Sequence, residues 1–345
     1  MQRRKWQPMQ GGFAKRAVDL AQSDGYRGNS RRDPMSFTAV LISIAPVFVI
    51  IILGYGLRRG GIPNVEFWNL NDKLVYWVLM PALLFQKTST LEISFGLIGS
   101  YAVVILGGFS AALIVGLVTA RFAGMEGPQA SSVMQGAARH NTFIALSVAE
   151  RVFGAPGLSL AALATSLLIP VTNVSVVTLM TVLLHAKDER GILPAILRDL
   201  ARNPLLLAVV AGVGMNLSGV GVIPVLHEVV ELLGNAALPV VLMCVGANLR
   251  LRAMQASTVP LVLSIVAKMI VFPSVVLVAG LAMGLSELEL TIAMLFGAAP
   301  TATNAYTLAR QMGGDAPLMA AIATIQTALA FMVLPLWLLV PGWVL

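Results

Sequence analysis

Two polar stretches decide the fold of this chain. Residues 135–142 read Gln-Gly-Ala-Ala-Arg-His-Asn-Thr, and residues 297–304 read Gly-Ala-Ala-Pro-Thr-Ala-Thr-Asn. Each interrupts an apolar run that is otherwise long enough to cross a bilayer, which takes about 20 residues. Asn141 or Thr142 can cap a new helix after the first stretch. Pro300 removes a backbone donor from the second stretch, and Thr301, Thr303 or Asn304 can cap the helix that follows. The two stretches therefore predict two helices that are broken inside a membrane.

The sequence around them is that of an integral membrane protein. Hydrophobic residues make up 57% of the chain and charged residues 11%, whereas soluble domains are about 25% charged. Backbone polar groups in lipid must bond within their own segment, so apolar runs of this length must be helices. We predict an all-α fold with ten transmembrane helices near residues 37–57, 67–86, 96–120, 128–151, 157–184, 196–217, 224–247, 257–283, 287–310 and 316–340.

The net charge of +7 is concentrated at the N-terminus. Residues 1–34 carry eight Lys and Arg against three Asp, and the rest of the chain carries 15 basic and 13 acidic residues. We therefore expect no nucleic-acid partner. The tail has no apolar core and is predicted to be disordered, and it is not a signal peptide. Our hypothesis is that translation starts at Met35, which N-terminal sequencing of the native protein would test.

The apolar segments repeat at a nearly constant separation. Pro46, Gly54 and Gly56 of the first match Pro204, Gly212 and Gly214 of the sixth, and Pro81 matches Pro239, all 158 residues apart. Five helices per half is an odd number, so the second half must enter the membrane upside down, as in alternating-access transporters. We predict a first repeat at 35–185, a cytoplasmic linker at 186–195 and an inverted second repeat at 196–345, with helices 4 and 9 broken at matching places.

Basic residues between the predicted helices give an orientation. The loops after helices 1, 3, 5, 7 and 9 hold ten Lys and Arg, and those after helices 2, 4, 6 and 8 hold Lys87 and Arg151 alone. Basic loops collect on the cytoplasmic side. We therefore predict a multi-pass protein of the cell (inner or plasma) membrane with both termini outside.

The broken helices supply the candidate site. Two half-helix N-termini would face the middle of the membrane with partial positive charge, and Arg139 adds a full one. This field favours an anion such as a carboxylate. The predicted substrate-binding residues are Arg139, His140, Asn141, Thr142, Asn173, Pro300, Thr301, Thr303, Asn304 and Gln326.

Several of these residues have a second interpretation. Arg139 can form a structural ion pair with Glu150, and His140 can be a packed core residue. Asn173 and Gln326 can join helices through hydrogen bonds. Lys268 and Asp72 are candidates for anion binding or proton coupling, although Lys268 can snorkel and Asp72 can pair with Lys73.

These residues resemble the auxin efflux carrier family, in its bacterial branch, from about residue 35 to the end. The resemblance lies in Pro46 through Gly56, the Pro-Ala-Leu-Leu-Phe stretch from residue 81, Arg139 to Thr142, the stretch 169–176, and Ala299 to Ala302 with residues 308–315. It implies ten spans in a 5+5 inverted repeat, with broken helices 4 and 9 crossing each other. It also implies a scaffold of spans 1, 2, 6 and 7 beside a moving domain, and organic-anion substrates such as auxin or dicarboxylates. A homodimer through the scaffold helices is also expected. This chain lacks a proline near Asn141 and carries Arg139 and His140 before it, which favours a small, strongly anionic substrate.

Two other functions compete with an anion carrier. A sodium- or proton-coupled ion exchanger of similar fold needs carboxylates at the crossover, but Glu150, Glu287 and Glu289 lie near segment ends. An intramembrane enzyme needs a motif such as HExxH or GxSxG, and the sequence has neither. The single Cys244 allows no internal disulfide and no cysteine metal site. We predict no enzyme activity, no cofactor and no metal.

Overall fold

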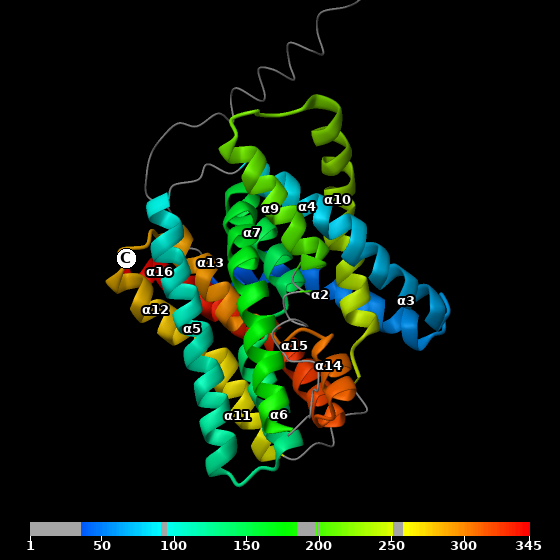
Figure 1. Ribbon diagram of the computed structural model, residues 1–345, viewed down its shortest axis with the longest axis vertical. Helices are drawn as coiled ribbons and strands as arrows, with labels where there is room; N and C mark the ends of the chain where they lie inside the picture. Colours follow the sequence, from blue (N-terminus) through cyan, green and yellow to red (C-terminus); the bar gives the residue numbers. More distant parts are fainter. Residues whose placement is uncertain (1–35, 91–94, 185–197, 199–200, 251–257) are drawn as a thin grey trace, which may run out of the picture. The chain divides into compact units, whose positions relative to one another are not determined.

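The computed structural model describes residues 36–90, 95–184, 198, 201–250 and 258–345, and within them all regular structure is helical (Figure 1). The predicted tail at 1–34 and the predicted linker at 186–195 lie outside these residues. The elements are α2 (Phe37–Arg59), α3 (Val65–Leu74), the π-helical η1 (Val75–Leu79), α4 (Met80–Ser89), α5 (Phe95–Phe122), α6 (Gly127–Ala138), α7 (Thr142–Leu183), α9 (Pro204–Leu217), α10 (Pro224–Ala247), α11 (Thr258–Val266), the π-helical η3 (Ala267–Val271), α12 (Phe272–Ala282), α13 (Glu287–Ala298), α14 (Ala305–Met312), α15 (Ala316–Leu339) and α16 (Pro341–Val344).

Six helical stretches of the described chain are long and apolar enough to cross a membrane. They are Phe37–Arg59, Gly99–Phe122, Gly127–Leu183, Pro224–Ala247, Thr258–Ala282 and Ala316–Val344. One of them, Gly127–Leu183, covers predicted helices 4 and 5, which meet at Gly154 with φ 62° and ψ −151°. The all-helical membrane fold is confirmed, and the number of ten crossings stays a prediction.

The outer surface and the centre of the helix bundle differ in the way that lipid requires. Large apolar side chains such as Ile52 and Leu232 are 67% and 73% exposed on α2 and α10. By contrast, α6 is buried at every residue from Ala130 to Ala138, and α13 at every residue from Leu290 to Ala298. A helix that is buried all round has no lipid-facing side, so α6 and α13 occupy the centre of the bundle.

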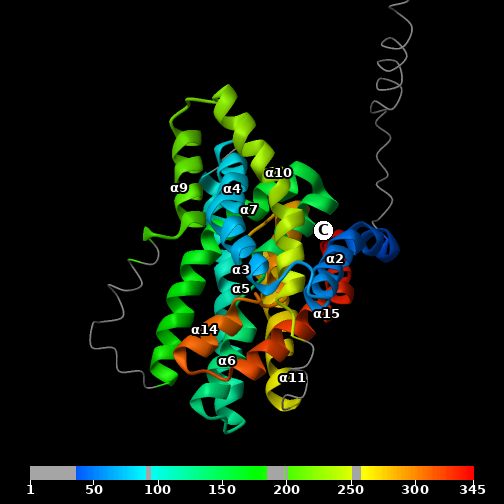
Figure 2. The ribbon, with the colours of Figure 1, turned by 90° about the vertical axis from the view of Figure 1, so that its right-hand side faces the viewer.

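In two pairs of neighbouring helices, a glycine of one helix packs closely against the backbone of the other. α2 packs on α10, and α9 lies beside α4, as Figure 2 shows. Gly54 of α2 touches the backbone of Met243 so closely that an added Cβ would overlap the Met243 carbonyl oxygen. Gly212 of α9 touches α4, where an added Cβ would lie 2.8 Å from the Phe85 carbonyl oxygen. Gly54 and Gly212 are 158 residues apart, as are Phe85 and Met243.

Candidate functional site

The first predicted break is present between α6 and α7. The helix ends at Ala138, and Arg139 is extended at φ −66° and ψ 145°. The Asn141 side-chain oxygen accepts hydrogen bonds from the backbone N–H groups of Phe143 (3.1 Å) and Ile144 (3.2 Å). Asn141 thus satisfies two of the N–H groups that have no partner inside the helix, and α7 begins at Thr142.

The second predicted break lies between α13 and α14. Ala299, directly before Pro300, is extended at φ −59° and ψ 138°. The prediction of a side-chain cap here was wrong, because Asn304 precedes α14 without a side-chain hydrogen bond to it. The backbone N–H groups of Ala305 and Tyr306 bond instead to the carbonyl oxygens of Ala302 and Thr303. A tight turn before the helix therefore takes the place of the cap.

The two breaks are hydrogen-bonded to each other. The backbone N–H of Asn141 donates to the Pro300 carbonyl at 2.7 Å. The Thr301 hydroxyl donates to the Gly136 carbonyl at 2.8 Å, and the Thr301 N–H donates to the Gln326 side-chain oxygen at 2.8 Å. The Gln326 side-chain NH₂ donates to Gly136 (3.0 Å) and to the Ser264 hydroxyl (3.1 Å). Buried polar groups of α13–α14, α15 and α11 thus hold the end of α6.

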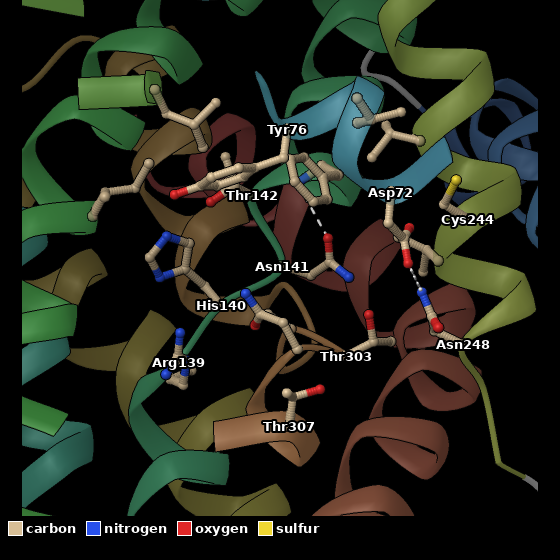
Figure 3. A pocket seen from close by; sticks show the side chains of 18 of the residues that line it. Asp72, Tyr76, Arg139, His140, Asn141, Thr142, Cys244, Asn248, Thr303 and Thr307 are labelled. Atoms are coloured by element: carbon tan, nitrogen blue, oxygen red, sulfur yellow. Dashed lines mark hydrogen bonds between the residues drawn. The ribbon is translucent and has the colours of Figure 1, made fainter. Parts of the chain in front are cut away.

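A cavity of about 660 Å³ opens beside the breaks (Figure 3). Eight of the predicted residues line it: Asp72, Arg139, His140, Asn141, Thr142, Asn173, Thr303 and Asn304. Pro300, Thr301, Gln326 and Lys268 are not among its lining residues. Thr301 and Gln326 are fully buried in the bonds that join the breaks.

Arg139 is the main positive charge on the α6–α7 side of the cavity. One guanidinium nitrogen lies 3.5 Å from the Asn173 side-chain oxygen. No carboxylate of the described residues forms an ion pair with Arg139, and its predicted partner Glu150 is exposed. A guanidinium held in a membrane interior beside a neutral amide keeps donors for an anionic ligand.

His140 and Asn141 add further unused hydrogen-bonding groups. His140 is 6% exposed, and neither of its ring nitrogens has a hydrogen-bond partner among the described residues. The side-chain NH₂ of Asn141 likewise has none there. Buried polar groups are nearly always bonded, so groups of this kind beside a cavity fit a site that bonds its ligand or water.

Lys268 lies behind this wall of the cavity rather than in it. It is fully buried in η3, where its amine nitrogen is 3.2 Å from the Phe296 carbonyl and 4.4 Å from the centre of the Phe272 ring. His140 packs against the ring of the same Phe296, with ring centres 5.5 Å apart. Lys268 therefore does not snorkel to the surface, and the π-helical turn that carries it is of a kind often found at functional sites.

The opposite wall comes from η1, α3 and α10. The Asn248 side-chain NH₂ donates to the Asp72 carboxylate at 3.0 Å. The predicted alternative for Asp72, a pair with Lys73, is not the contact that forms. Cys244 lines the same wall and accepts a hydrogen bond from Asn71 at 3.2 Å.

Other lining residues were not predicted. They include Tyr76, Thr172, Asn203, Asn248, Arg250, Tyr306 and Thr307. Asn203 lies within predicted helix 6, and Asn248 directly follows predicted helix 7. In the structure they lie directly before α9 and directly after α10, so a polar residue near a helix end was the only available signal. In the described part of the chain, no cluster of three or more His, Cys, Asp or Glu residues could hold a metal ion.

Comparisons with known proteins agree with this architecture. The family model described as "Membrane transport protein" matches residues 39–338. An "Uncharacterized transporter" of the archaeon Methanothermobacter thermautotrophicus is 23% identical over 306 residues, which cover 88% of this chain and 99% of the relative. The family consists of transporters rather than enzymes, and the resemblance found in the sequence is confirmed. The chain is a multi-pass membrane protein that belongs to the membrane transport protein family, the auxin efflux carrier family of membrane transporters.

Proposed function

We propose that this protein is a secondary-active or facilitative efflux carrier of small organic anions, chiefly carboxylates, which bind where the two breaks meet. One observation carries the proposal. Arg139 lines a cavity of about 660 Å³ with no ion-pair partner among the described residues. The volume falls within the range of small-molecule sites.

The surroundings of Arg139 favour a carboxylate over a cation. The N-terminus of α7 adds partial positive charge next to it. Guanidinium groups match the planar geometry of a carboxylate and bind it in a bidentate manner. Thr303 and Asn304 line the cavity from the second break and are neutral, so they would orient the substrate without repelling it.

An inverted repeat and alternating access form the second part of the proposal. The matched pairs Gly54–Met243 and Gly212–Phe85 support two equivalent halves, at 35–185 and 196–345, with ten crossings in total. The mutually bonded breaks support crossed half-helices at the substrate site. Inverted repeats of this kind rock against each other around a fixed midplane site.

Two ionisable residues are the candidates for proton coupling. Asp72 lines the cavity and accepts a hydrogen bond from Asn248, which directly follows α10. Lys268 is fully buried, and its amine contacts a carbonyl and a ring rather than a carboxylate. A buried charge without a counter-ion is costly, so anion binding nearby would be coupled to the charge of Lys268.

Thermal unfolding in detergent tests the substrate class. The full chain and Arg139→Gln are heated with a panel of mono- and dicarboxylates. A ligand at 100 times its Kd stabilises the folded state by about 2.7 kcal/mol. We expect at least one carboxylate to raise the Tm of the wild type and to leave the Tm of Arg139→Gln unchanged.

Arg121→Gln is the matched control, because Arg121 is an exposed arginine at the end of α5 that lines neither described cavity. It should respond to the carboxylate as the wild type does. If sodium or pH changes the Tm while no carboxylate does, the anion proposal fails and the ion-exchanger alternative takes its place.

A further inference from the structure

A second cavity, of about 630 Å³, adjoins the first. It lies between the C-terminal ends of α2 and α10, α14 and the start of α15. Three of its lining residues, Asn248, Arg250 and Tyr306, also line the central cavity. The two cavities thus share one wall, although their remaining lining residues differ.

This second cavity is strongly basic. Arg58, Arg59 and Arg250 line it, and no Asp or Glu is among its described lining residues. Asp72, which lines the neighbouring cavity, interacts electrostatically with Arg58 but is hydrogen-bonded to Asn248. One carboxylate against three guanidinium groups leaves a surplus of positive charge.

The contacts of the three arginines within the protein do not use all of their hydrogen-bond donors. One terminal nitrogen of Arg58 is buried and has no hydrogen-bond partner among the described residues. Arg59 donates to the Tyr55 hydroxyl at 2.9 Å, and the Arg250 guanidinium lies 3.8 Å above the centre of the Tyr306 ring. Stacking on an aromatic face fixes a guanidinium while leaving its in-plane N–H donors free for a ligand.

We propose that this cavity is a second anion site, which binds the carboxylate of the transported organic anion on its path to or from Arg139. This assignment rests on the proposed function for the identity of the ligand. Arg250 and Tyr306 form the shared wall, so a carboxylate bonded to Arg58 and Arg250 is adjacent to the central cavity. Transport needs sites that bind the ligand weakly enough to release it, and a second site that includes the exposed Arg59 meets that need.

Equilibrium binding tests the proposal with the full chain in phosphatidylcholine nanodiscs. The probe is radiolabelled malonate, with sulfate as a second probe. The variants are Arg58→Gln combined with Arg59→Gln, Arg139→Gln, and Arg121→Gln as the exposed control. Because a charge-assisted bond to a ligand is lost, we expect the double variant to weaken one class of binding about tenfold or more and to retain the class that depends on Arg139.

A milder variant guards against misfolding. Arg59→Gln alone changes an exposed side chain and should weaken the same class of binding by a smaller factor. Arg121→Gln should bind both probes as the wild type does. If binding of neither malonate nor sulfate depends on Arg58 and Arg59, the second site is overturned, whatever Arg139→Gln does.

The same measurement separates this proposal from the proposed function. If Arg139→Gln loses all binding while the double variant binds as the wild type does, the second site is overturned and the central one is kept. The reverse result would keep the second site and overturn the central anion site. If replacing half of the lipid by phosphatidylglycerol abolishes the Arg58-dependent binding of malonate, a lipid headgroup occupies the cavity and the substrate path is overturned.

Discussion

The two breaks, and the two glycine contacts, share backbone geometry but differ in chemistry. Gly54 meets Met243 and Gly212 meets Phe85, with equivalent residues 158 apart. At the breaks, Arg139 and Ala299 adopt nearly the same extended backbone, and each donates its N–H to the carbonyl four residues earlier at 2.8 Å. The same interruption of a helix therefore occurs in both halves.

The side chains at these equivalent breaks are not alike. The first break carries Arg139 and His140, and its cap Asn141 is 1% exposed. The second carries hydroxyl and amide groups, and Asn304 is exposed without a cap bond. The similar backbone therefore interrupts both helices beside the cavity, whereas the unequal side chains place the positive charge at the first break alone.

The largest expected effect comes from cutting the link between the halves. Gln326→Leu leaves the Thr301 N–H without its acceptor and removes a donor from Gly136. Orphaned buried groups cost about 1–3 kcal/mol each, so the free energy of unfolding should fall by about 2–4 kcal/mol. SDS titration followed by circular dichroism measures it. Gln311→Leu, at an exposed position on α14, should change it by less than about 0.5 kcal/mol.

The glycine pairs test whether the halves are equivalent in packing. Gly54→Ala and Gly212→Ala place a methyl group against a neighbouring backbone and should each lower the free energy of unfolding by about 1–3 kcal/mol. Gly56 and Gly214 are also 158 residues apart, but an added Cβ meets nothing within 4 Å. Alanine there should stabilise by up to about 1 kcal/mol. Unequal signs within either pair would contradict the equivalence of the halves.

The caps test the difference between the breaks. Asn141→Ala removes two bonds to the start of α7 and should cost about 1–2 kcal/mol. Asn304→Ala removes no cap bond and should stay within about 0.5 kcal/mol of the wild type. Both variants are measured by the same SDS titration. If both variants lost the same free energy of unfolding, Asn304 would also cap its helix in the membrane.

The smallest effect separates two hydroxyl groups of the second break. Thr301→Val removes the bond to the Gly136 carbonyl and should cost about 1 kcal/mol. Thr303 lines the cavity, and its hydroxyl forms no hydrogen bond to another described residue. Thr303→Val should therefore leave the Tm of the unliganded protein within 1–2 °C, as expected of a surface substitution, while weakening carboxylate binding. A loss of stability in Thr303→Val without a loss of binding would remove Thr303 from the site.

Much of the candidate site was predictable because it depends on local chemistry. Pro300 cannot donate in a helix, and Arg139 cannot lie cheaply in lipid, so both breaks followed from their own sequence. Six of the eight predicted residues that line the central cavity lie at the breaks for that reason. Thr301 and Gln326 were indistinguishable from them in sequence, because a polar residue near a break can face either a cavity or another helix.

A helical membrane protein with two broken helices could be predicted from the order of residues, because apolar run length and helix-breaking residues act within a segment. The hydrogen bonds from the Asn141 N–H to the Pro300 carbonyl and from the Gln326 side chain to the Gly136 carbonyl became visible in the folded structure. The same holds for the neighbouring cavities that share Arg250 and Tyr306. These residues come from separate helices, and their contacts depend on how the helices pack rather than on the composition of any one of them.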